Sequence, residues 1–311
     1  SQTVRNLYYQ AQLNWVRSFG KHNVTAMGLF SRQENARGSV MPTYREDWAF
    51  RTTYNYADRY FIEYNGAYNG SEKFSPENRF AFFNSGAIGW MISEEPFMKF
   101  FREKKIVDML KVRASYGEIG SDQLGPDPFD SSRRWLYMNQ WAYGGHTTMD
   151  LNQTQSIYTW YRESAIGNKD IQWEVVKKLN VGIDYSFLEG LFAGSVEFFR
   201  DVRSNIFVYG GDRSIPSYFG GTPPSVNKGK IRTSGYELEL RINKTFANDL
   251  RVWGNFSMTH ARNKVLVKDD QALRPGYQKA AGHAVNQYTS YIDAGFIQSY
   301  DQLFGAPAHD A

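Results

Sequence analysis

The sequence predicts an all-β protein: a transmembrane antiparallel β-barrel of up-and-down strands, of which about ten are present. Three observations lead to this fold class. Apolar and polar residues alternate over long stretches, which places them on opposite faces of a strand. Several stretches reach the roughly 9–11 residues that cross a bilayer at a steep tilt. Short turns mostly alternate with long loops, as they do in outer-membrane barrels.

The clearest strand pair lies at residues 173–207. Leu179, Val181 and Ile183 share one parity and polar residues occupy the other, so the first strand has one apolar and one polar face. A tight turn at residues 188–190 leads into a second long strand. We expect this hairpin to cross the membrane, with its start near the outer interface and its turn near the periplasmic one.

The same pattern repeats along the chain. Further strands are expected at residues 5–18, 24–33, 48–56, 60–69, 80–92, 110–116, 230–245 and 250–259. Residues 34–46 and 71–78 contain Gly, Pro and polar residues typical of loops. Residues 96–105, PFMKFFREKK, are expected to form a short amphipathic helical turn. The sequence begins in mid-strand and ends in turn-like residues. We therefore expect residues 1–311 to be a single segment of a larger barrel.

The composition fits a barrel better than a helical membrane protein. Hydrophobic residues make up 41% of the chain and the mean hydropathy is −0.56. No run approaches the roughly 20 apolar residues of a spanning helix. A barrel strand needs apolar residues only at every second position, and aromatic residues, here 16%, form girdles at both membrane interfaces.

Several function classes are excluded by what the sequence lacks. The net charge of +4 comes without a clustered basic run, so nucleic acid is not an expected partner. There is no cysteine, and the five histidines have no ligand-like spacing, so we expect neither a metal nor another cofactor. No phosphate-binding glycine loop or nucleophile elbow is present, so the protein is not expected to be an enzyme. Asp269, Asp270 and Asp293 are interpreted as solvated loop charge in preference to a calcium site.

Three long segments are expected to be extracellular loops, at about residues 120–172, 208–229 and 264–311. The first is too long for a passive connection and is rich in aromatic residues. Flat rings with polar edges supply rigid contact area for sugars or peptides, although the same rings could pack the loop on itself or onto a partner. The candidate ligand-contact residues are Trp135, Tyr137, Trp141, Tyr143, Tyr158, Trp160, Tyr161, Tyr218 and Phe219.

Several segments resemble the SusC/RagA-like family of TonB-dependent outer-membrane transporters of Bacteroidetes. LKVRASYGEIGSD at 110–122 is similar to the family's R-x-S-Y-G-x-x-G-N, with Ser121 in place of Asn. NKDIQWEVVKKLNVGIDY at 168–185 is similar to N-P-x-L-x-W-E…N-x-G-x-D, with Lys169 in place of Pro. Further matches are NKGKIRTSGYELEL at 227–240, GAIGWMISEEPF at 86–97, and residues 255–265 and 291–302. The matches follow the family order over most of the chain.

The resemblance implies a barrel of about 22 strands with a plug in its lumen. This chain would be part of that barrel, without the plug, the TonB box and the C-terminal strands. The family's location is the outer membrane of Gram-negative bacteria, in contact with its lipid. Its activity is uptake of oligosaccharides or oligopeptides. The implied partners are a SusD/RagB-like surface lipoprotein, which forms a lid, and the TonB–ExbB–ExbD complex, reached through parts absent here.

Two other functions remain open from the residues alone. The first is a soluble β-rich carbohydrate-binding protein, in which Leu179, Val181 and Ile183 would face a protein core. The second is a barrel-borne hydrolase, for which the sequence offers no nucleophile–base pattern.

Overall fold

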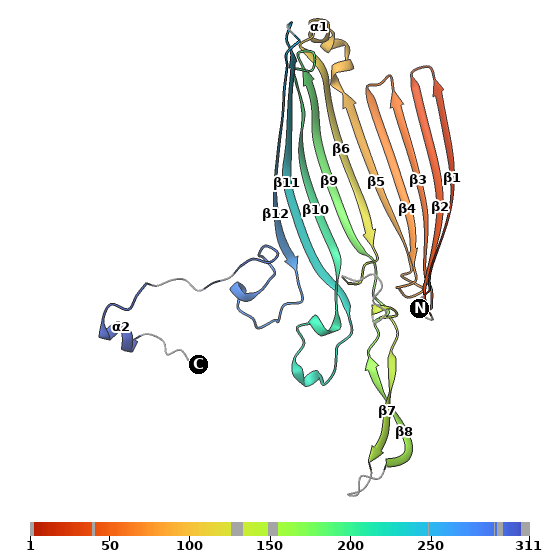
Figure 1. The fold of residues 1–311 in the computed structure, drawn as a ribbon, viewed down its shortest axis with the longest axis vertical. Coiled ribbons are helices and arrows are strands. Elements are labelled where there is room, and N and C mark those ends of the chain that lie inside the picture. The colour runs from red at the N-terminus through yellow and green to blue at the C-terminus, as the bar shows by residue number, and fades with distance from the viewer. Residues whose placement is uncertain are drawn as a thin grey trace.

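The computed structural model describes residues 3–38, 41–125, 133–148, 155–247, 249–288, 290 and 295–305. Its main body is one ten-stranded antiparallel sheet (Figure 1). In sheet order, its strands are β1 (Val4–Phe19), β2 (His22–Arg37), β3 (Thr43–Tyr56), β4 (Tyr60–Ser71), β5 (Phe80–Met91), β6 (Val107–Ser121), β9 (Glu174–Phe187), β10 (Phe192–Val208), β11 (Val226–Thr245) and β12 (Arg251–Val267). Two further strands, β7 (Gln140–Thr148) and β8 (Gln155–Ala165), pair only with each other. The predicted all-β, up-and-down order of about ten strands is confirmed.

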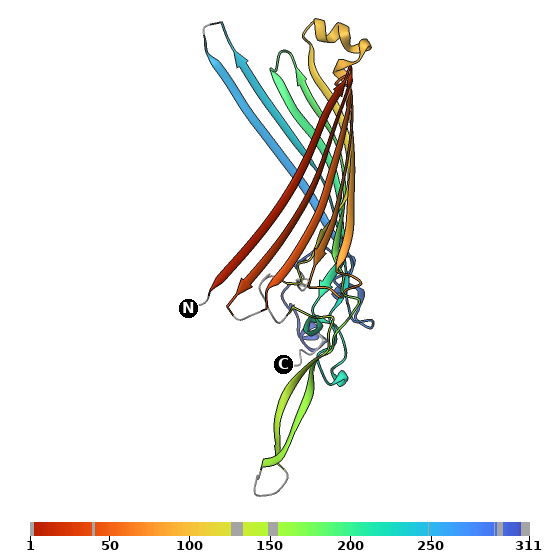
Figure 2. The same cartoon turned by 90° about the vertical axis from the view of Figure 1, so that its right-hand side faces the viewer.

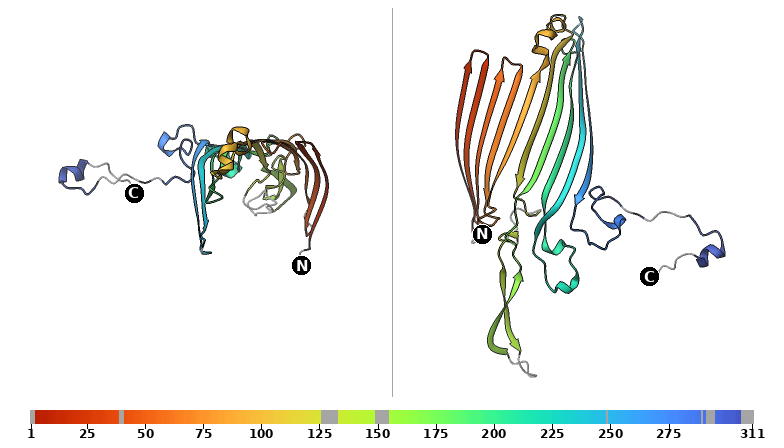
Figure 3. Two further views of the ribbon diagram at one scale, coloured as in Figure 1. Left: turned by 90° about the horizontal axis from the view of Figure 1, so that it is seen from above. Right: turned by 180° about the vertical axis from the view of Figure 1, so that it is seen from behind.

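The sheet curves into an arch when it is seen from above (Figure 3) and from the side (Figure 2). Strands β1 and β12 are its two edges, so the described sheet is an open part of a barrel wall. Among the residues that the structure describes, no helix is long and apolar enough to cross a membrane.

The two ends of the arch differ. At one end, here called the turn end, short turns join β1 to β2, β3 to β4, β9 to β10 and β11 to β12 (Figure 1). The same end carries η1 (Ile92–Glu94), η2 (Pro96–Met98) and α1 (Lys99–Glu103), which confirms the helical turn expected at 96–105. The opposite end, the loop end, carries the longer connections, the β7–β8 hairpin and the chain after β12.

The turn between β9 and β10 shows how the sequence forms a tight reversal. Leu188, Glu189 and Gly190 all have positive φ, at 55°, 57° and 78°. This region is unfavourable for residues with a Cβ. The Asp108 carboxylate accepts the backbone N–H groups of Glu189 at 3.2 Å and Gly190 at 2.9 Å, which holds the turn in place.

One face of the sheet is apolar, and we assign it to the convex side of the arch because the opposite face carries the ion pairs typical of a hydrated barrel lumen. Leu179, Val181 and Ile183 lie on it and are 42%, 40% and 43% exposed. Their neighbours across the ladder, Val112 opposite Ile183 and Tyr116 opposite Leu179, continue the same face. In the described part of the chain no protein core covers these three side chains, contrary to what the soluble alternative requires.

The concave face carries charged residues that pair across strands. Arg51 on β3 contacts Glu63 on β4 at 2.9 Å. Arg113 on β6 contacts Asp184 on β9 at 3.1 Å and also binds Glu197 on β10. The pairing keeps each charge compensated where water is partly excluded.

Several expected boundaries were wrong. The loop expected at 34–46 is shorter, because main-chain pairing of β2 with β3 continues to Asn35 opposite Thr43. The loop expected from residue 264 begins after Val267, which pairs with Lys230. The segment 120–172 contains the β7–β8 hairpin, which was expected as loop. Main-chain pairing carries β2, β3 and β12 past the residues at which the sequence pattern was expected to end them.

Candidate ligand-contact surfaces at the loop end

A buried cluster anchors the connections at the loop end. It contains Phe74, Phe83, Leu124, Ile171 and Trp173, which come from the β4–β5 loop, β5, the chain after β6 and the chain before β9. The Trp173 ring lies 5.2 Å from the Phe74 ring and 5.7 Å from the Phe83 ring, centroid to centroid. Trp173 therefore lies at the start of its strand, as expected, but it is buried in this cluster. There it fixes the end of the β6–β9 connection that adjoins the sheet.

A second anchor is the buried guanidinium of Arg134. It donates to Glu72 at 2.7 Å and to the backbone carbonyls of Met41 and Pro42. A buried charge is costly unless it is paired and hydrogen-bonded, and here three acceptors from two other connections surround it. The Arg134 guanidinium also lies 4.6 Å from the centroid of the Trp135 ring.

The predicted aromatic residues occupy three separate places. Trp135 and Tyr137 line a cavity of about 400 Å³ together with residues of β3, β4 and β5. Five rings, Trp141, Tyr143, Tyr158, Trp160 and Tyr161, lie on the β7–β8 hairpin. Tyr218 and Phe219 lie in η5 (Ser217–Phe219), in the β10–β11 connection, and are exposed. The structure therefore brings the hairpin rings together but not the whole predicted set.

The hairpin rings are presented on a two-stranded ribbon that extends beyond the sheet (Figure 1). Tyr143 lies directly opposite Tyr161, with ring centroids 5.9 Å apart in an edge-to-face arrangement. A Cβ at Gly144 would come within 2.4 Å of the Trp160 ring, so glycine lets that ring lie flat on the ribbon. Trp141 and Tyr161 are among the more exposed rings of the chain, and their faces are accessible to a ligand or a partner.

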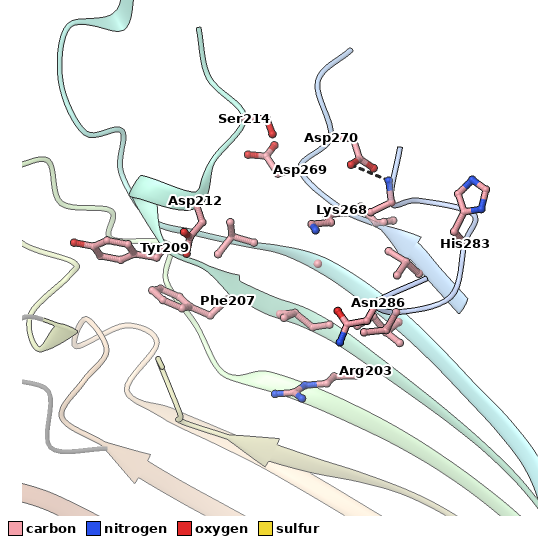
Figure 4. Close-up of a pocket in the computed structure, with 18 of the residues that line it drawn as sticks. Arg203, Phe207, Tyr209, Asp212, Ser214, Lys268, Asp269, Asp270, His283 and Asn286 are labelled. Carbon is pink, nitrogen blue, oxygen red and sulfur yellow. Dashed lines mark hydrogen bonds between the residues drawn. The ribbon is translucent and has the colours of Figure 1, made fainter. Parts of the chain in front are cut away.

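A larger cleft, of about 940 Å³, lies between the β10–β11 connection and the chain after β12 (Figure 4). Phe207 and Tyr209 line it from the end of β10 and the residues that follow, and Lys268 and His283 line it from the chain after β12. Sequence reasoning did not find this cleft. Its lining comes from segments between residues 123 and 287 that are far apart in the chain, and no local motif marks them.

Two aspartates fix the walls of this cleft. Asp269 accepts hydrogen bonds from Arg213 at 3.3 Å and Lys228 at 2.5 Å. Burial tends to raise the pKa of Asp269, but these hydrogen bonds outweigh it, and the pKa lies below its ordinary value. Asp270 accepts the N–H groups of Ala280 at 3.1 Å and Ala281 at 2.9 Å, and its pKa is also lowered despite the opposing effect of burial.

These contacts correct the expectation of solvated loop charge. Asp269 pairs with Arg213 of the β10–β11 connection and with Lys228 of β11. Asp270 accepts backbone N–H groups from within the chain after β12. Asp293, grouped with them in the sequence, lies outside the described residues. Within the described ranges, no group of three or more His, Asp or Glu side chains is arranged to hold a metal ion.

Comparison with known proteins identifies the arch. Residues 2–296 match the family model described as TonB dependent receptor-like, beta-barrel. The chain belongs to this family. It is 23% identical to TonB-dependent receptor P3 of Formosa agariphila over 94% of this chain and 30% of that protein. It is 28% identical to the TonB-dependent receptor SusC of Bacteroides thetaiotaomicron over 79% of this chain and 27% of that protein.

A solved structure supports the same fold. The RagAB peptide transporter superposes with a TM-score of 0.68 and 17% identity, over 86% of this chain and 31% of that one. The chain thus spans about 30% of the length of the relatives it matches. The arch is accordingly barrel wall of a TonB-dependent receptor-like protein, and the resemblance to the SusC/RagA-like family is confirmed.

Proposed function

We propose that this chain forms wall and external loops of an outer-membrane importer that takes up oligopeptides or oligosaccharides. The observation that carries the proposal is the contrast between the two faces of the arch. Its convex face is apolar along the strands, as lipid contact requires, and its concave face is charged and ion-paired, as a hydrated lumen requires. The role is transport, with no bond broken.

The orientation follows from the asymmetry of the two ends. In outer-membrane barrels the short turns face the periplasm and the long loops face the outside. The loop end of this chain would then be extracellular, with loops built from residues within 120–172, 208–229 and 264–311. The β7–β8 hairpin and the 940 Å³ cleft would both face the medium from which a nutrient arrives.

The partners follow from the family. A SusD/RagB-like surface lipoprotein would cover the loop end, and the TonB–ExbB–ExbD complex would supply energy through parts of the protein outside this chain. The similarity to SusC and to the RagAB peptide transporter supports both assignments. The hairpin rings would then contact either the ligand or the lid.

The test uses the complete receptor that contains this chain. Two ligand pools are offered, a tryptic digest of casein and a series of malto-oligosaccharides, and retained molecules are identified by mass spectrometry. Trp141→Ala combined with Tyr161→Ala should weaken binding of the retained pool about tenfold or more, because exposed rings of this kind often dominate contact energy. Trp15→Ala, on the convex face, is the matched control and should bind normally.

Two results would count against the proposal. Retention of neither pool by a folded, membrane-inserted receptor would remove these ligand classes. Unchanged affinity of the double variant would assign the hairpin rings to packing or to the lid.

A further inference from the structure

The segment that joins β5 to β6 at the turn end exposes a group of phenylalanines. Phe97, Phe100 and Phe101 are 62%, 57% and 42% exposed. They lie on η2 and α1, at the end of the arch opposite the ligand-facing loops (Figure 1). Large exposed rings on a charged segment indicate a contact surface for a partner that has both apolar and polar groups.

One buried carboxylate pins this segment to the convex face. Tyr60 and Trp90 lie opposite each other on β4 and β5, on the same face as the exposed Ile62 and Ile88. Glu95 accepts the Tyr60 hydroxyl at 2.6 Å and the Trp90 indole N–H at 2.9 Å. Because both donors belong to the apolar face, the segment starts on the lipid side of the wall, at the level where the strands end.

The rest of the segment combines rings with cations. Residues 92–106 hold four basic and three acidic residues. Three of the basic side chains form ion pairs: Lys99 with Glu103, Arg102 with Glu94 and Lys105 with Glu189. The Lys104 ammonium lies 4.4 Å from the centroid of the Phe100 ring, and the Phe100 and Phe101 rings meet edge to face at 5.5 Å. Such a surface, with exposed apolar rings beside charged side chains, matches the headgroup region of a phospholipid leaflet.

We propose that residues 92–106 are an interfacial anchor that places Phe97, Phe100 and Phe101 in the phospholipid headgroup region at the turn end, with Glu95 holding the anchor against the barrel wall. Phospholipid is favoured over a protein partner because Glu95 starts the segment on the apolar face of the wall, which would face lipid in the proposed barrel. The inference rests on the proposed membrane barrel, and its test separates the two.

The test measures depth in the membrane. The chain has no cysteine, so Phe97→Cys can carry a fluorophore in the complete receptor once any cysteine elsewhere is replaced. The receptor is reconstituted in phosphatidylethanolamine–phosphatidylglycerol nanodiscs with nitroxide lipids labelled at the headgroup or deep in the acyl chain. Val181→Cys, on the convex face, reports the barrel itself, and Lys21→Cys, in the exposed β1–β2 turn, reports the aqueous side of the same end.

The three positions should differ. Headgroup nitroxide should quench the label at 97 about twofold or more beyond the label at 21, as expected for an interfacial side chain. Acyl-chain nitroxide should quench the label at 181. If 181 is quenched and 97 behaves like 21, the anchor is refuted while the barrel stands. If 97 is shielded from lipid nitroxide and from aqueous iodide alike, a protein covers it and the proposal also fails. If 181 is not quenched, the membrane barrel is wrong and the anchor falls with it.

A second variant tests the role of Glu95. Glu95→Gln keeps the shape but weakens the charge-assisted bonds to Tyr60 and Trp90. Lipid quenching of the label at position 97 should fall in this variant. It should stay unchanged in the control Glu103→Gln, whose carboxylate pairs with Lys99 on the exposed side of α1. Equal quenching in all three proteins would overturn the positioning role.

Discussion

Replacing Trp173 by alanine should loosen the loop end without melting the barrel wall. Trp173 is 3% exposed, contacts Phe74 and Phe83, and donates its indole N–H to the Arg79 carbonyl at 3.3 Å. Deleting a buried Trp side chain costs about 3–5 kcal/mol. The wall is held by continuous main-chain pairing, so the cost should fall on the local opening of the connections. At about 1.4 kcal/mol per decade, local opening should become about 10²–10⁴ times more frequent.

Hydrogen exchange of the complete receptor in detergent micelles measures this opening. The Ile171 amide, bonded to the Asn168 carbonyl, and the Gln172 amide, bonded to the Asn227 side chain, report the base of the connection. Both should exchange faster in Trp173→Ala, while the Val181 amide within the wall should not change. Trp253→Ala is the control, because its ring is exposed on β12 near the turn end.

Two outcomes would refute this reasoning. Unchanged exchange at residues 171 and 172 would mean that the cluster does not hold the connection. Equal acceleration at 181 would mean that the loops and the wall open as one unit.

Two further predictions concern the wall and the cleft. Val181→Arg should make insertion of the barrel into the membrane about 2–4 kcal/mol less favourable. Asn180→Arg, beside Glu197 on the concave face, should assemble normally. Heat-modifiable gel mobility measures the assembled fraction, and equal assembly of the two variants would contradict the assignment of faces. The pKa of Asp269 lies below its ordinary value of 3.8. Its bonds to Arg213 and Lys228 therefore stabilise the cleft fully at pH values above 3.8, and this stabilisation is lost as the pH falls through the lowered pKa and the carboxylate is protonated. Asp269→Asn at neutral pH should therefore open the chain after β12 and speed the exchange of its amides, as protonation of Asp269 in acid is expected to do. Exchange as slow as in the unmodified protein would contradict this.

The wall could be predicted from sequence because one apolar face and one polar face impose a period of two along each strand. Leu179, Val181 and Ile183 carry that signal directly, and the structure places them on one face. The signal ends where apolar and polar residues stop alternating. The extension of β12 to Val267 depends on pairing with Lys230, and residue type does not encode that pairing.

The loop-end surfaces were less predictable. The aromatic content of residues 120–172 identified the hairpin rings, but it could not separate Trp135, which lies beside a buried guanidinium, from Trp141, which is exposed. The cleft was missed because it depends on contacts such as Asp269 with Arg213, 56 positions apart. Charge spacing in the chain gives no indication of such a pair.

The structure separates residues that hold the loop end from residues that a ligand can reach, and the two roles can be measured independently. Strands β7 and β8 pair only with each other, so the rings on them are attached to the wall through the base that Trp173 and Arg134 fix. Removing Trp141 and Tyr161 should weaken ligand binding and leave exchange at Ile171 unchanged. Trp173→Ala should raise exchange at Ile171 and weaken binding only through the lost position of the hairpin. If the ring variant also loosened the base, the hairpin would be part of the anchored core, and the platform interpretation of its rings would fail.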